Sequence, residues 1–355
     1  MAEKSLMKGN EALAEAAIRA GCKCFFGYPI TPQTEISAYL SKRMPKVGGT
    51  FLQAESEVAA INMVYGCAGS GIRCMTSSSS PGISLKAEGI SYIAGADLPC
   101  VIIDVVRGGP GLGGIQPSQA DYWQITKGLA HGDFHVLVYA PASVQEMADM
   151  VAKAFDMADE YRMPAMILAD GLLGQMMEPV EFPDVEIKMS DASKKPWAAN
   201  GHKGERKHNI INSLYLQPQE LEDKVVERYK RYEDIKAKHT MAVADYCDDA
   251  DIVVVAYGST ARLAKSAVDA ARKEGLKVGM FRPVTLWPFP EKELQEATKN
   301  AKKVLTVEMS MGQMIDDVKL AINCSKPVEF FGRTGGIIPA PADILNKIKE
   351  MGGNK

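Results

Sequence analysis

The stretch Cys100-Val-Ile-Ile-Asp-Val-Val106, followed directly by Arg107-Gly-Gly-Pro-Gly-Leu-Gly-Gly114, decides the fold of this chain. An aliphatic, β-branched run that ends in a glycine-rich loop is typical of a buried strand in a parallel sheet. Similar runs recur along the first half of the sequence, at Cys22–Gly27, Phe51–Ala54, Ile72–Thr76, Val136–Tyr139 and Ala165–Ala169. Helical patterns fill most of the gaps between them, the clearest being Ser143–Tyr161. This alternation predicts a parallel sheet with helices on both faces.

A second alternation begins near Asp251 and predicts a smaller α/β domain. Its expected elements are the strand Ile252–Ala256, the helix Ser259–Glu274, the strands Val278–Arg282, Val304–Glu308 and Val328–Phe331, and the helix Ala342–Met351. We therefore expect an α/β fold with two open parallel-sheet domains, at residues 1–185 and 245–355. Residues 186–244 form a connector with a charged loop and a helix that begins at Pro218. That helix either packs on its own domains or is a strut that grips another subunit.

Composition narrows the class of protein. The chain has 355 residues, of which 46% are hydrophobic and 24% charged, as in a folded globular protein. Its net charge of −3 does not favour nucleic acid as a partner. No apolar run approaches the roughly 18 residues of a membrane span, and no secretory signal is present at the start. The cysteine count of 7 is odd and includes no Cys-x-x-C pair, which predicts reduced thiols in a cytoplasmic protein without its own iron–sulfur cluster.

Several motifs follow predicted strands, so we expect them at the carboxyl edge of the sheet, where α/β proteins bind ligands. In Tyr28-Pro-Ile-Thr-Pro32, Thr31 suits a helix N-cap and Pro32 suits the first helical position. In Gln53-Ala-Glu-Ser-Glu57, the two glutamates are either first-turn acids favoured by the helix dipole or include a proton donor held in a pocket. Both motifs are candidates for a functional site.

The other two motifs are polar loops. Thr76-Ser-Ser-Ser-Ser-Pro-Gly82 offers hydroxyls that either bind polar groups or cap the following helix. The glycines after Arg107 allow close approach of the backbone to a ligand, and Arg107 presents a fork for a carboxylate or phosphate. The glycine spacing also fits a dinucleotide-binding loop, but Pro110 and Pro117 interrupt the required geometry, so a nucleotide-dependent dehydrogenase is the weaker hypothesis. No P-loop or hydrolase nucleophile elbow is present.

Together, in this order and at these spacings, the motifs resemble those of one family, the alpha subunits of thiamin-diphosphate-dependent 2-oxoacid:ferredoxin oxidoreductases. The resemblance covers nearly the whole chain and is carried by Gly27–Thr34, Gln53–Glu57, Thr76–Gly82, Arg107–Gly114 and Gln116–Asp121. It implies a pyrimidine-binding first domain and a transketolase C-terminal-like second domain. The segments at Gln53 and Thr76 look most like the branched-chain, 2-oxoisovalerate members, with the 2-oxoglutarate members as the alternative.

The resemblance implies roles for three residues. Glu57 matches the glutamate that contacts N1′ of the cofactor's aminopyrimidine ring and exchanges a proton there, so it is the expected catalytic and cofactor-binding residue. Glu55 is the weaker match. Thr31 and Arg107 match positions that hold the substrate carboxylate, and the alternative for Arg107 is a contact with coenzyme A. No metal ligand is expected on this chain.

The sequence lacks the Gly-Asp-Gly and Asn-Asn segments with which thiamin enzymes hold Mg²⁺ and the diphosphate. The resemblance therefore implies that thiamin diphosphate is shared with a diphosphate-binding beta subunit. Mg²⁺ and the iron–sulfur clusters are expected on partner subunits, which include gamma and ferredoxin-like chains. The expected reaction of this heteromeric complex is oxidative decarboxylation of a 2-oxoacid with coenzyme A to an acyl-CoA, with ferredoxin as the electron acceptor. The other hypothesis is a structural subunit that contributes no reacting group.

Overall fold

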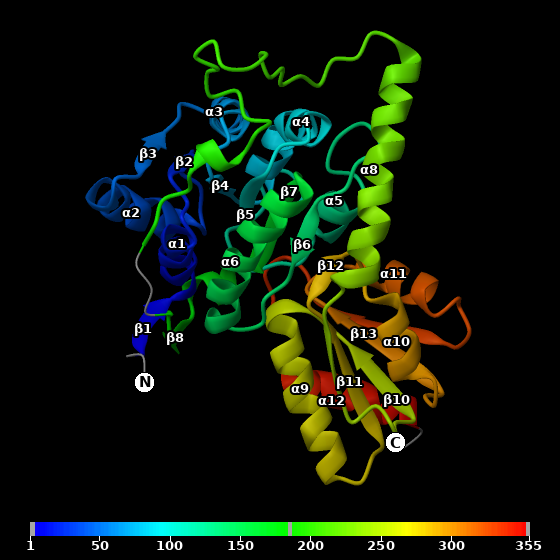
Figure 1. Cartoon of the computed structure of the whole chain (residues 1–355). Coiled ribbons are helices and arrows are strands. Elements are labelled where there is room, and N and C mark those ends of the chain that lie inside the picture. Colours follow the sequence, from blue (N-terminus) through cyan, green and yellow to red (C-terminus); the bar gives the residue numbers. More distant parts are fainter. Residues whose placement is uncertain (1–3, 184–186, 353–355) are drawn as a thin grey trace.

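A computed structural model describes residues 4–183 and 187–352 of the chain (Figure 1). The chain forms two α/β domains, each built around one large sheet, and a connector between them. In these residues the larger sheet has seven strands and the smaller sheet has five. Each sheet is parallel except for one antiparallel edge strand. The predicted fold class, with two open and mostly parallel sheets, is confirmed.

The larger sheet combines the N-terminal half of the chain with one strand from far along the sequence. In spatial order its strands are β12 (Thr285–Trp287), β6 (Leu137–Tyr139), β7 (Pro164–Asp170), β5 (Cys100–Val106), β4 (Cys74–Ser78), β2 (Cys24–Gly27) and β3 (Thr50–Gln53). β5 and β7 are buried along their whole length because helices cover both of their faces. β12 pairs antiparallel with β6, so the C-terminal part of the chain completes the N-terminal sheet.

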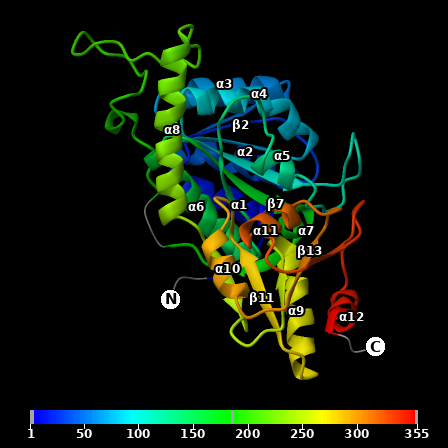
Figure 2. The same ribbon diagram turned by 90° about the vertical axis from the view of Figure 1, so that its right-hand side faces the viewer.

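Helices cover both faces of the larger sheet (Figure 2). One face carries α1 (Gly9–Arg19), α2 (Thr34–Arg43) with the 3₁₀ turn η1 (Met44–Val47), α6 (Val144–Tyr161) and α7 (Gly171–Gln175). The other face carries the paired helices α3 (Glu57–Gly69) and α4 (Pro81–Gly95). The short helix α5 (Tyr122–Thr126) follows the glycine-rich loop, and β1 (Ser5–Lys8) pairs with β8 (Met177–Val180) as a separate two-stranded sheet. No helix in the described part of the chain is both long and apolar enough to cross a membrane.

The smaller sheet is built from the C-terminal part of the chain. Its strands are, in spatial order, β14 (Val328–Gly332), β13 (Lys303–Glu308), β10 (Ile252–Val255), β11 (Val278–Pro283) and β9 (Ala242–Asp245). The helices α9 (Gly258–Lys273) and α12 (Pro341–Gly352) pack together on one face, and α10 (Glu291–Thr298) and α11 (Met314–Ala321) pack together on the other.

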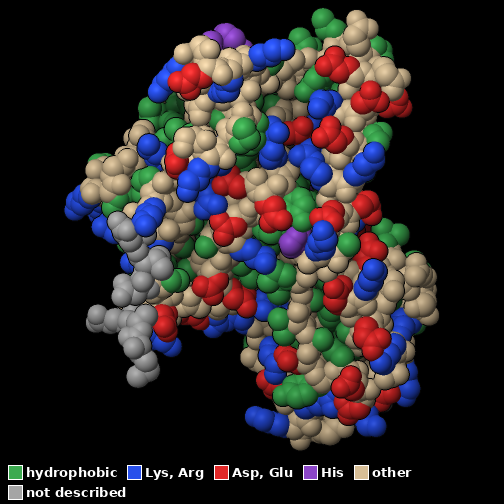
Figure 3. Space-filling view, in the orientation of Figure 1, with side chains coloured by type: hydrophobic (Ala, Val, Ile, Leu, Met, Phe, Trp, Pro, Cys, Tyr) green, Lys and Arg blue, Asp and Glu red, His purple; other side chains and the backbone are tan. Residues whose placement is uncertain are grey.

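The connector contains the 3₁₀ turn η2 (Ala192–Lys194) and the long helix α8 (Pro218–Lys238). α8 packs on the larger domain, where Arg228 and Arg231 pair with Asp97 and Tyr232 is buried. Its outer side leaves Val226 49% exposed. The space-filling view shows acidic and basic side chains interspersed over both domains on the visible face (Figure 3).

Buried hydrogen bonds hold the carboxyl edges of the two sheets together. The Gln119 side chain donates to the Tyr257 carbonyl at 2.9 Å and accepts from the Thr260 hydroxyl at 2.8 Å. Asp170 accepts a hydrogen bond of 2.6 Å from the hydroxyl of Ser259, in the first turn of α9. Each of these groups is buried, so an unmade bond would leave a polar group without water, and the domains are therefore held in one arrangement.

Candidate functional site

The predicted site residues come from three loops at the carboxyl edge of the larger sheet. β3, β2, β4 and β5 are parallel neighbours in that order, so their following loops emerge on the same side. Thr31 follows β2, Glu57 follows β3 and Arg107 follows β5. The structure brings two of them into contact, because Nη1 of Arg107 donates to the Thr31 carbonyl at 3.0 Å.

Glu57 is the first residue of α3. The hydroxyl of Ser56 caps this helix by accepting the Ala59 N–H at 3.1 Å. Glu57 is only 7% exposed, whereas Glu55 is exposed on the loop before it. Within residues 4–183 and 187–352, the Glu57 carboxyl accepts no hydrogen bond. A buried carboxyl with its acceptor positions unfilled can bind a donor that this chain does not supply.

Gly82, in the first turn of α4, lies against this carboxyl. A Cβ atom added at Gly82 would lie 2.9 Å from Oε1 of Glu57 and 2.1 Å from Oγ of Ser78. Contacts below 3.0 Å force neighbouring atoms to move, so only glycine fits here without displacing Glu57. Close packing of two helix N-termini thus fixes the position of the carboxyl.

Arg107 is 7% exposed and presents its guanidinium beside Thr31. Nη2 donates to the Leu112 carbonyl at 3.2 Å, and Nε is buried without a hydrogen-bond partner in the described residues. No carboxylate of the described chain forms an ion pair with it. A guanidinium carries five N–H donors, so donors remain for an external carboxylate or phosphate. No helix begins at Gly109, and the loop therefore lacks the turn-to-helix geometry of a dinucleotide site.

The prediction that Thr31 caps a helix and Pro32 begins it is wrong. α2 begins at Thr34, after a turn in which the buried Gln33 accepts a hydrogen bond of 2.6 Å from the Ser77 hydroxyl. Gln33 also donates to the Tyr28 carbonyl at 3.3 Å. These contacts anchor the turn to β4 and delay the helix by two residues. Thr31 is exposed, and its hydroxyl has no partner in the described chain.

The serine loop holds Arg107 in place. The Ser80 hydroxyl donates to Oδ2 of Asp121 at 2.6 Å and accepts the Arg107 N–H at 3.1 Å. Ser80 has a φ of 32°, which is strained for a residue with a side chain, so these bonds compensate an unfavourable backbone. The hydroxyls of Ser78 and Ser79 are buried without a partner among the described residues.

Two buried ionisable residues behind this edge were not predicted. Asp104, in β5, is fully buried and accepts the Ser80 N–H at 3.2 Å. Burial, reinforced by the charge of Asp121, raises the pKa of Asp104 well above its usual range. Lys86, in α4, is also fully buried, and its ammonium group donates to the Thr76 hydroxyl at 2.8 Å and to the Ser77 carbonyl at 2.9 Å. The one acid in an aliphatic strand was a usable signal for Asp104, whereas nothing in the sequence around Lys86 marks it as buried.

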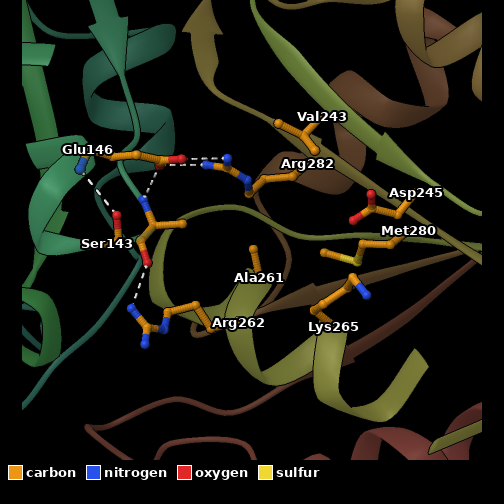
Figure 4. A pocket seen from close by; sticks show the side chains of 10 residues that line it. Ser143, Glu146, Val243, Asp245, Ala261, Arg262, Lys265, Met280 and Arg282 are labelled. Atoms are coloured by element: carbon orange, nitrogen blue, oxygen red, sulfur yellow. Dashed lines mark hydrogen bonds and ion pairs between the residues drawn. The ribbon is translucent and has the colours of Figure 1, made fainter. Parts of the chain in front are cut away.

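A separate cavity of about 320 Å³ lies between the domains (Figure 4). Arg282 forms two hydrogen bonds of 2.8 Å to Glu146 there, and Arg262 pairs with Glu178 at 2.7 Å. None of the predicted site residues lines it. Both arginines of this cavity are already paired with glutamates. The cavity is therefore a weaker candidate for anion binding than the Arg107 loop. No group of three or more His, Cys, Asp or Glu side chains in the described chain is placed to hold a metal ion.

Comparisons with known proteins identify the family of the chain. Residues 15–257 match the family described as "Pyruvate flavodoxin/ferredoxin oxidoreductase, thiamine diP-bdg", and residues 250–344 match "Pyruvate:ferredoxin oxidoreductase core domain II". The ketoisovalerate oxidoreductase subunit VorB of Methanothermobacter thermautotrophicus is 48% identical over 352 residues, which are 98% of each chain. The 2-oxoglutarate synthase subunit KorA of Methanothermobacter marburgensis is 38% identical, covering 99% of this chain and 100% of KorA.

A solved structure shares the whole fold. It is the 2-oxoglutarate:ferredoxin oxidoreductase from Magnetococcus marinus with 2-oxoglutarate, coenzyme A and succinyl-CoA bound. It matches with a TM-score of 0.86 at 26% identity over 98% of this chain, which spans 65% of that structure's chain. The fold and the matches define a chain of the thiamin-diphosphate-binding oxidoreductases. The chain belongs to the pyruvate flavodoxin/ferredoxin oxidoreductase family and is a homologue of ketoisovalerate oxidoreductase subunits. The predicted family and enzyme class are confirmed.

Proposed function

We propose that this chain is the catalytic alpha subunit of a heteromeric 2-oxoacid:ferredoxin oxidoreductase that acts on 2-oxoisovalerate. The complex converts the 2-oxoacid and coenzyme A to an acyl-CoA and carbon dioxide, and ferredoxin accepts the electrons. The observation that carries the proposal is Glu57, a carboxyl that is almost buried at a helix N-terminus and accepts no hydrogen bond from the described chain. A proton-exchanging group in this position needs a partner from outside the chain.

Glu57 fits the aminopyrimidine end of thiamin diphosphate. Oε1 of the Glu57 carboxyl lies against Gly82 of α4, and this close packing fixes where the carboxyl stands. When bound, thiamin diphosphate supplies the electron sink that makes loss of carbon dioxide from a 2-oxoacid possible. Glu57 holds and exchanges a proton at a ring nitrogen, a task for which a fixed carboxyl of low exposure is suited.

Arg107 and Thr31 bind the carboxylate of the substrate in this proposal. The guanidinium is fixed by the Thr31 and Leu112 carbonyls and retains donors, including its buried Nε. Thr31, whose carbonyl accepts a hydrogen bond from the guanidinium, is an exposed residue. A fixed, charge-assisted donor set orients a carboxylate, and orientation can supply several kcal/mol of a rate enhancement.

The remainder of the active site lies on partner subunits. We propose that a beta subunit binds the diphosphate and Mg²⁺, and that gamma and ferredoxin-like subunits carry the iron–sulfur clusters. The support is the absence of Gly-Asp-Gly, Asn-Asn and Cys-x-x-C segments from the sequence. The complex is proposed to act in the cytoplasm, which the seven free cysteines support.

The preference for 2-oxoisovalerate rests on 48% identity to a ketoisovalerate oxidoreductase subunit against 38% to a 2-oxoglutarate synthase subunit. The test is a steady-state assay of the co-purified complex with coenzyme A and a viologen acceptor, using 2-oxoisovalerate, 2-oxoglutarate and pyruvate in turn. We expect kcat/KM to be highest for 2-oxoisovalerate, with preferences of about 10- to 200-fold, the range that small differences in an apolar pocket produce. A preference for 2-oxoglutarate would show that 2-oxoglutarate, and not 2-oxoisovalerate, is the substrate. The absence of turnover with all three 2-oxoacids would reject the proposed oxidoreductase function.

The T31A and R107A variants separate a catalytic from a structural subunit. In a catalytic subunit both substitutions raise KM for the 2-oxoacid. If KM and kcat stay unchanged in both variants of the assembled complex, the chain contributes no group to substrate binding and the structural alternative holds.

A further inference from the structure

The connector carries apolar side chains that the rest of the described chain leaves uncovered. Six large hydrophobic residues are exposed on α8 and on the segment just before it, namely Ile210, Leu214, Leu216, Leu221, Val226 and Tyr229. The first three are each at least 65% exposed, and the other three are between 37% and 49% exposed. α8 lies along the outside of the molecule in both ribbon views (Figure 1 and Figure 2). Apolar side chains gathered in this way on a surface indicate a site of protein–protein contact.

The segment before α8 presents an apolar face outward. Residues 209–216 have no regular secondary structure and form no backbone–backbone hydrogen bond within the described chain. Ile211 lies over Gly69 of α3, and Ser213 lies over Gly95 of α4. The exposed apolar residues of the segment occupy the even positions, Ile210, Leu214 and Leu216. This alternation is typical of extended chain with one face packed and the other available for a partner.

α8 packs with one side on its own domain and leaves another side open. The packed side is formed by the buried residues Arg228, Tyr232 and Ile235. Beside it lies a shallow hollow of about 570 Å³, whose lining residues are Asp133, Val225, Val226, Tyr229, Lys230 and Glu233. All of these except Asp133 belong to α8. A hollow along one side of a helix can receive the side chains of a second helix that packs against it.

The charges of α8 favour a second copy of the same helix as that partner. The half before Tyr229 is mainly acidic and carries Glu220, Glu222, Asp223, Lys224 and Glu227. The half after it is mainly basic and carries Lys230, Glu233, Asp234, Lys236 and Lys238. Arg228 and Arg231 do not enter this comparison because both pair with Asp97. Antiparallel packing of two copies brings the acidic half of one helix against the basic half of the other, and it also aligns the helix dipoles favourably.

Three residues set the register of such a pair. Glu222, Tyr229 and Lys236 follow one another at intervals of seven residues, so they share one side of α8. With a twofold axis at Tyr229, Glu222 of each copy lies opposite Lys236 of the other. Glu222 accepts a hydrogen bond of 3.0 Å from the neutral Gln219 and has no cationic partner in the described chain. Lys236 pairs with Glu233 at 2.8 Å, but an ammonium group has three donors and can serve a second carboxylate.

We propose that the open side of α8 is a contact between two copies of this chain, which pair antiparallel about a twofold axis through Tyr229. Such a contact is isologous, so each charged and apolar group of the helix is used twice. The outward face of residues 209–216 extends the contact beyond the N-terminal end of α8. In this arrangement α8 packs on its own domain and also grips another subunit. The contact concerns the assembly of the complex and is independent of the proposed reaction.

The first test is a cysteine crosslink in the purified complex. Y229C places a thiol on the twofold axis, and we expect oxidation with copper-phenanthroline to give a disulfide-linked pair of this chain, identified by its intact mass. E227C is the matched control, because this exposed residue lies two positions earlier and points to a different side of the helix. The wild type, whose Cys324 is exposed, gives the background. A crosslink from Y229C to a different subunit would show that another protein covers α8 and would overturn the proposal.

The second test reverses the charges and measures, by sedimentation velocity, the dissociation constant of the complex that contains two copies of this chain. We expect E222K to raise this constant about 10-fold, because two symmetry-related attractions become repulsions. The double variant E222K/K236E restores opposite charges and should return the constant to within about threefold of the wild type. E227K reverses a charge away from the contact and should leave the constant unchanged.

The substituted side chains Glu222, Glu227 and Lys236 are all exposed, so the variants should fold, and far-UV circular dichroism checks this. Recovery of pairing in the double variant would support the antiparallel arrangement, because no other register places these two charges opposite each other. If the wild-type complex contains only one copy of this chain, or if the double variant dissociates as readily as E222K, the proposal is wrong.

Discussion

Both domains place a buried glutamate at the carboxyl edge of a parallel sheet, and the two glutamates differ in how their oxygens are occupied. Glu308 ends β13 and accepts four hydrogen bonds, from the Ser310 hydroxyl and from the N–H groups of Gln313, Met314 and Ile315. Glu57 begins α3 and accepts none from the described chain. Glu308 therefore has its bonding capacity used within the fold, whereas Glu57 has it available.

The buried polar groups around the two glutamates differ in the same way. Around Glu308 and Gln119 the buried polar side chains are paired across the domain boundary. Around Glu57, the hydroxyls of Ser78 and Ser79 and Nε of Arg107 are buried without partners in the described residues. Unpaired buried polar atoms are costly to a fold, and those at this edge are consistent with the binding site that we propose there.

The largest expected effect is the loss of kcat in the E57Q variant, which the matching variant at Glu308 should not show. E57Q removes the exchangeable proton, and we expect kcat of the complex to fall about 100- to 10,000-fold, the usual contribution of a general acid or base. Its free energy of unfolding should change by less than about 1 kcal/mol, because no hydrogen bond is lost. Steady-state kinetics and urea unfolding measure the two quantities.

E308Q is the matched contrast. In the wild type, three backbone N–H groups donate to the Glu308 carboxylate. The glutamine amide replaces one of these acceptor oxygens with an NH₂ donor, so we expect about 2–4 kcal/mol of destabilisation. The kcat of the fraction that folds should stay within a few-fold of wild type. If E308Q lost activity as E57Q does while remaining stable, the division between a structural and a functional glutamate would be wrong.

A smaller loss is expected from G82A. The added Cβ would meet Oγ of Ser78 at 2.1 Å and Oε1 of Glu57 at 2.9 Å, so the carboxyl must move. We expect kcat/KM to fall about 10- to 100-fold, since a misplacement of about 1 Å has effects of this size. G66A in α3 is the control, because nothing lies within 4 Å of its Cβ position, and alanine should stabilise the helix by about 0.5–1 kcal/mol. Equal activities of the two variants would exclude a need for close packing at Glu57.

R107K sharpens the assignment of the anion site. Lysine keeps the charge but loses the planar fork, and we expect KM for the 2-oxoacid to rise about 10- to 100-fold, equivalent to one or two charge-assisted hydrogen bonds. Initial rates against 2-oxoacid and against coenzyme A are measured in parallel. A rise in KM for coenzyme A alone would assign Arg107 to that substrate instead.

The smallest effect concerns His135, which stacks on Trp287 with ring centroids 4.6 Å apart. Burial lowers the pKa of His135 to about 4, so between pH 6.5 and 4 the unfolded chain binds a proton that the folded chain does not. Stability is therefore lost as pH falls through this window, by roughly 1–2 kcal/mol after allowance for partial exposure. H135F should lack this loss in urea unfolding at pH 7 and pH 4.5, and an identical loss in both proteins would contradict the assignment.

Local sequence predicted most elements because their signals lie within one segment. The strand Cys100–Val106 was predicted at the bounds observed, and the helix predicted over Ser143–Tyr161 begins one residue later because Ser143 is its N-cap. β12 was missed, because it is three residues long and pairs with β6 from more than a hundred residues away along the sequence. Pairing of that kind depends on how the domains dock and leaves no local pattern.

The site residues, like the strands and helices, were predicted only where a local motif marks them. The motifs around Thr31, Glu57 and Arg107 were recognisable because each follows a strand, and strand order brings them to one edge. The local pattern around α3 did not distinguish Glu57 from Glu55, the family resemblance favoured Glu57, and of the two only Glu57 is buried. Lys86 was missed because one lysine on a helix is normally solvated. The domain bounds at 185 and 245 stay predictions.

The most direct measurement is the structure of the assembled complex with thiamin diphosphate bound, read at the distance between the Glu57 carboxyl and N1′ of the aminopyrimidine ring. We predict a hydrogen bond of about 2.6–3.2 Å, with the diphosphate held by a different chain. A ring bound far from Glu57, or the whole coenzyme held by this chain alone, would contradict the account.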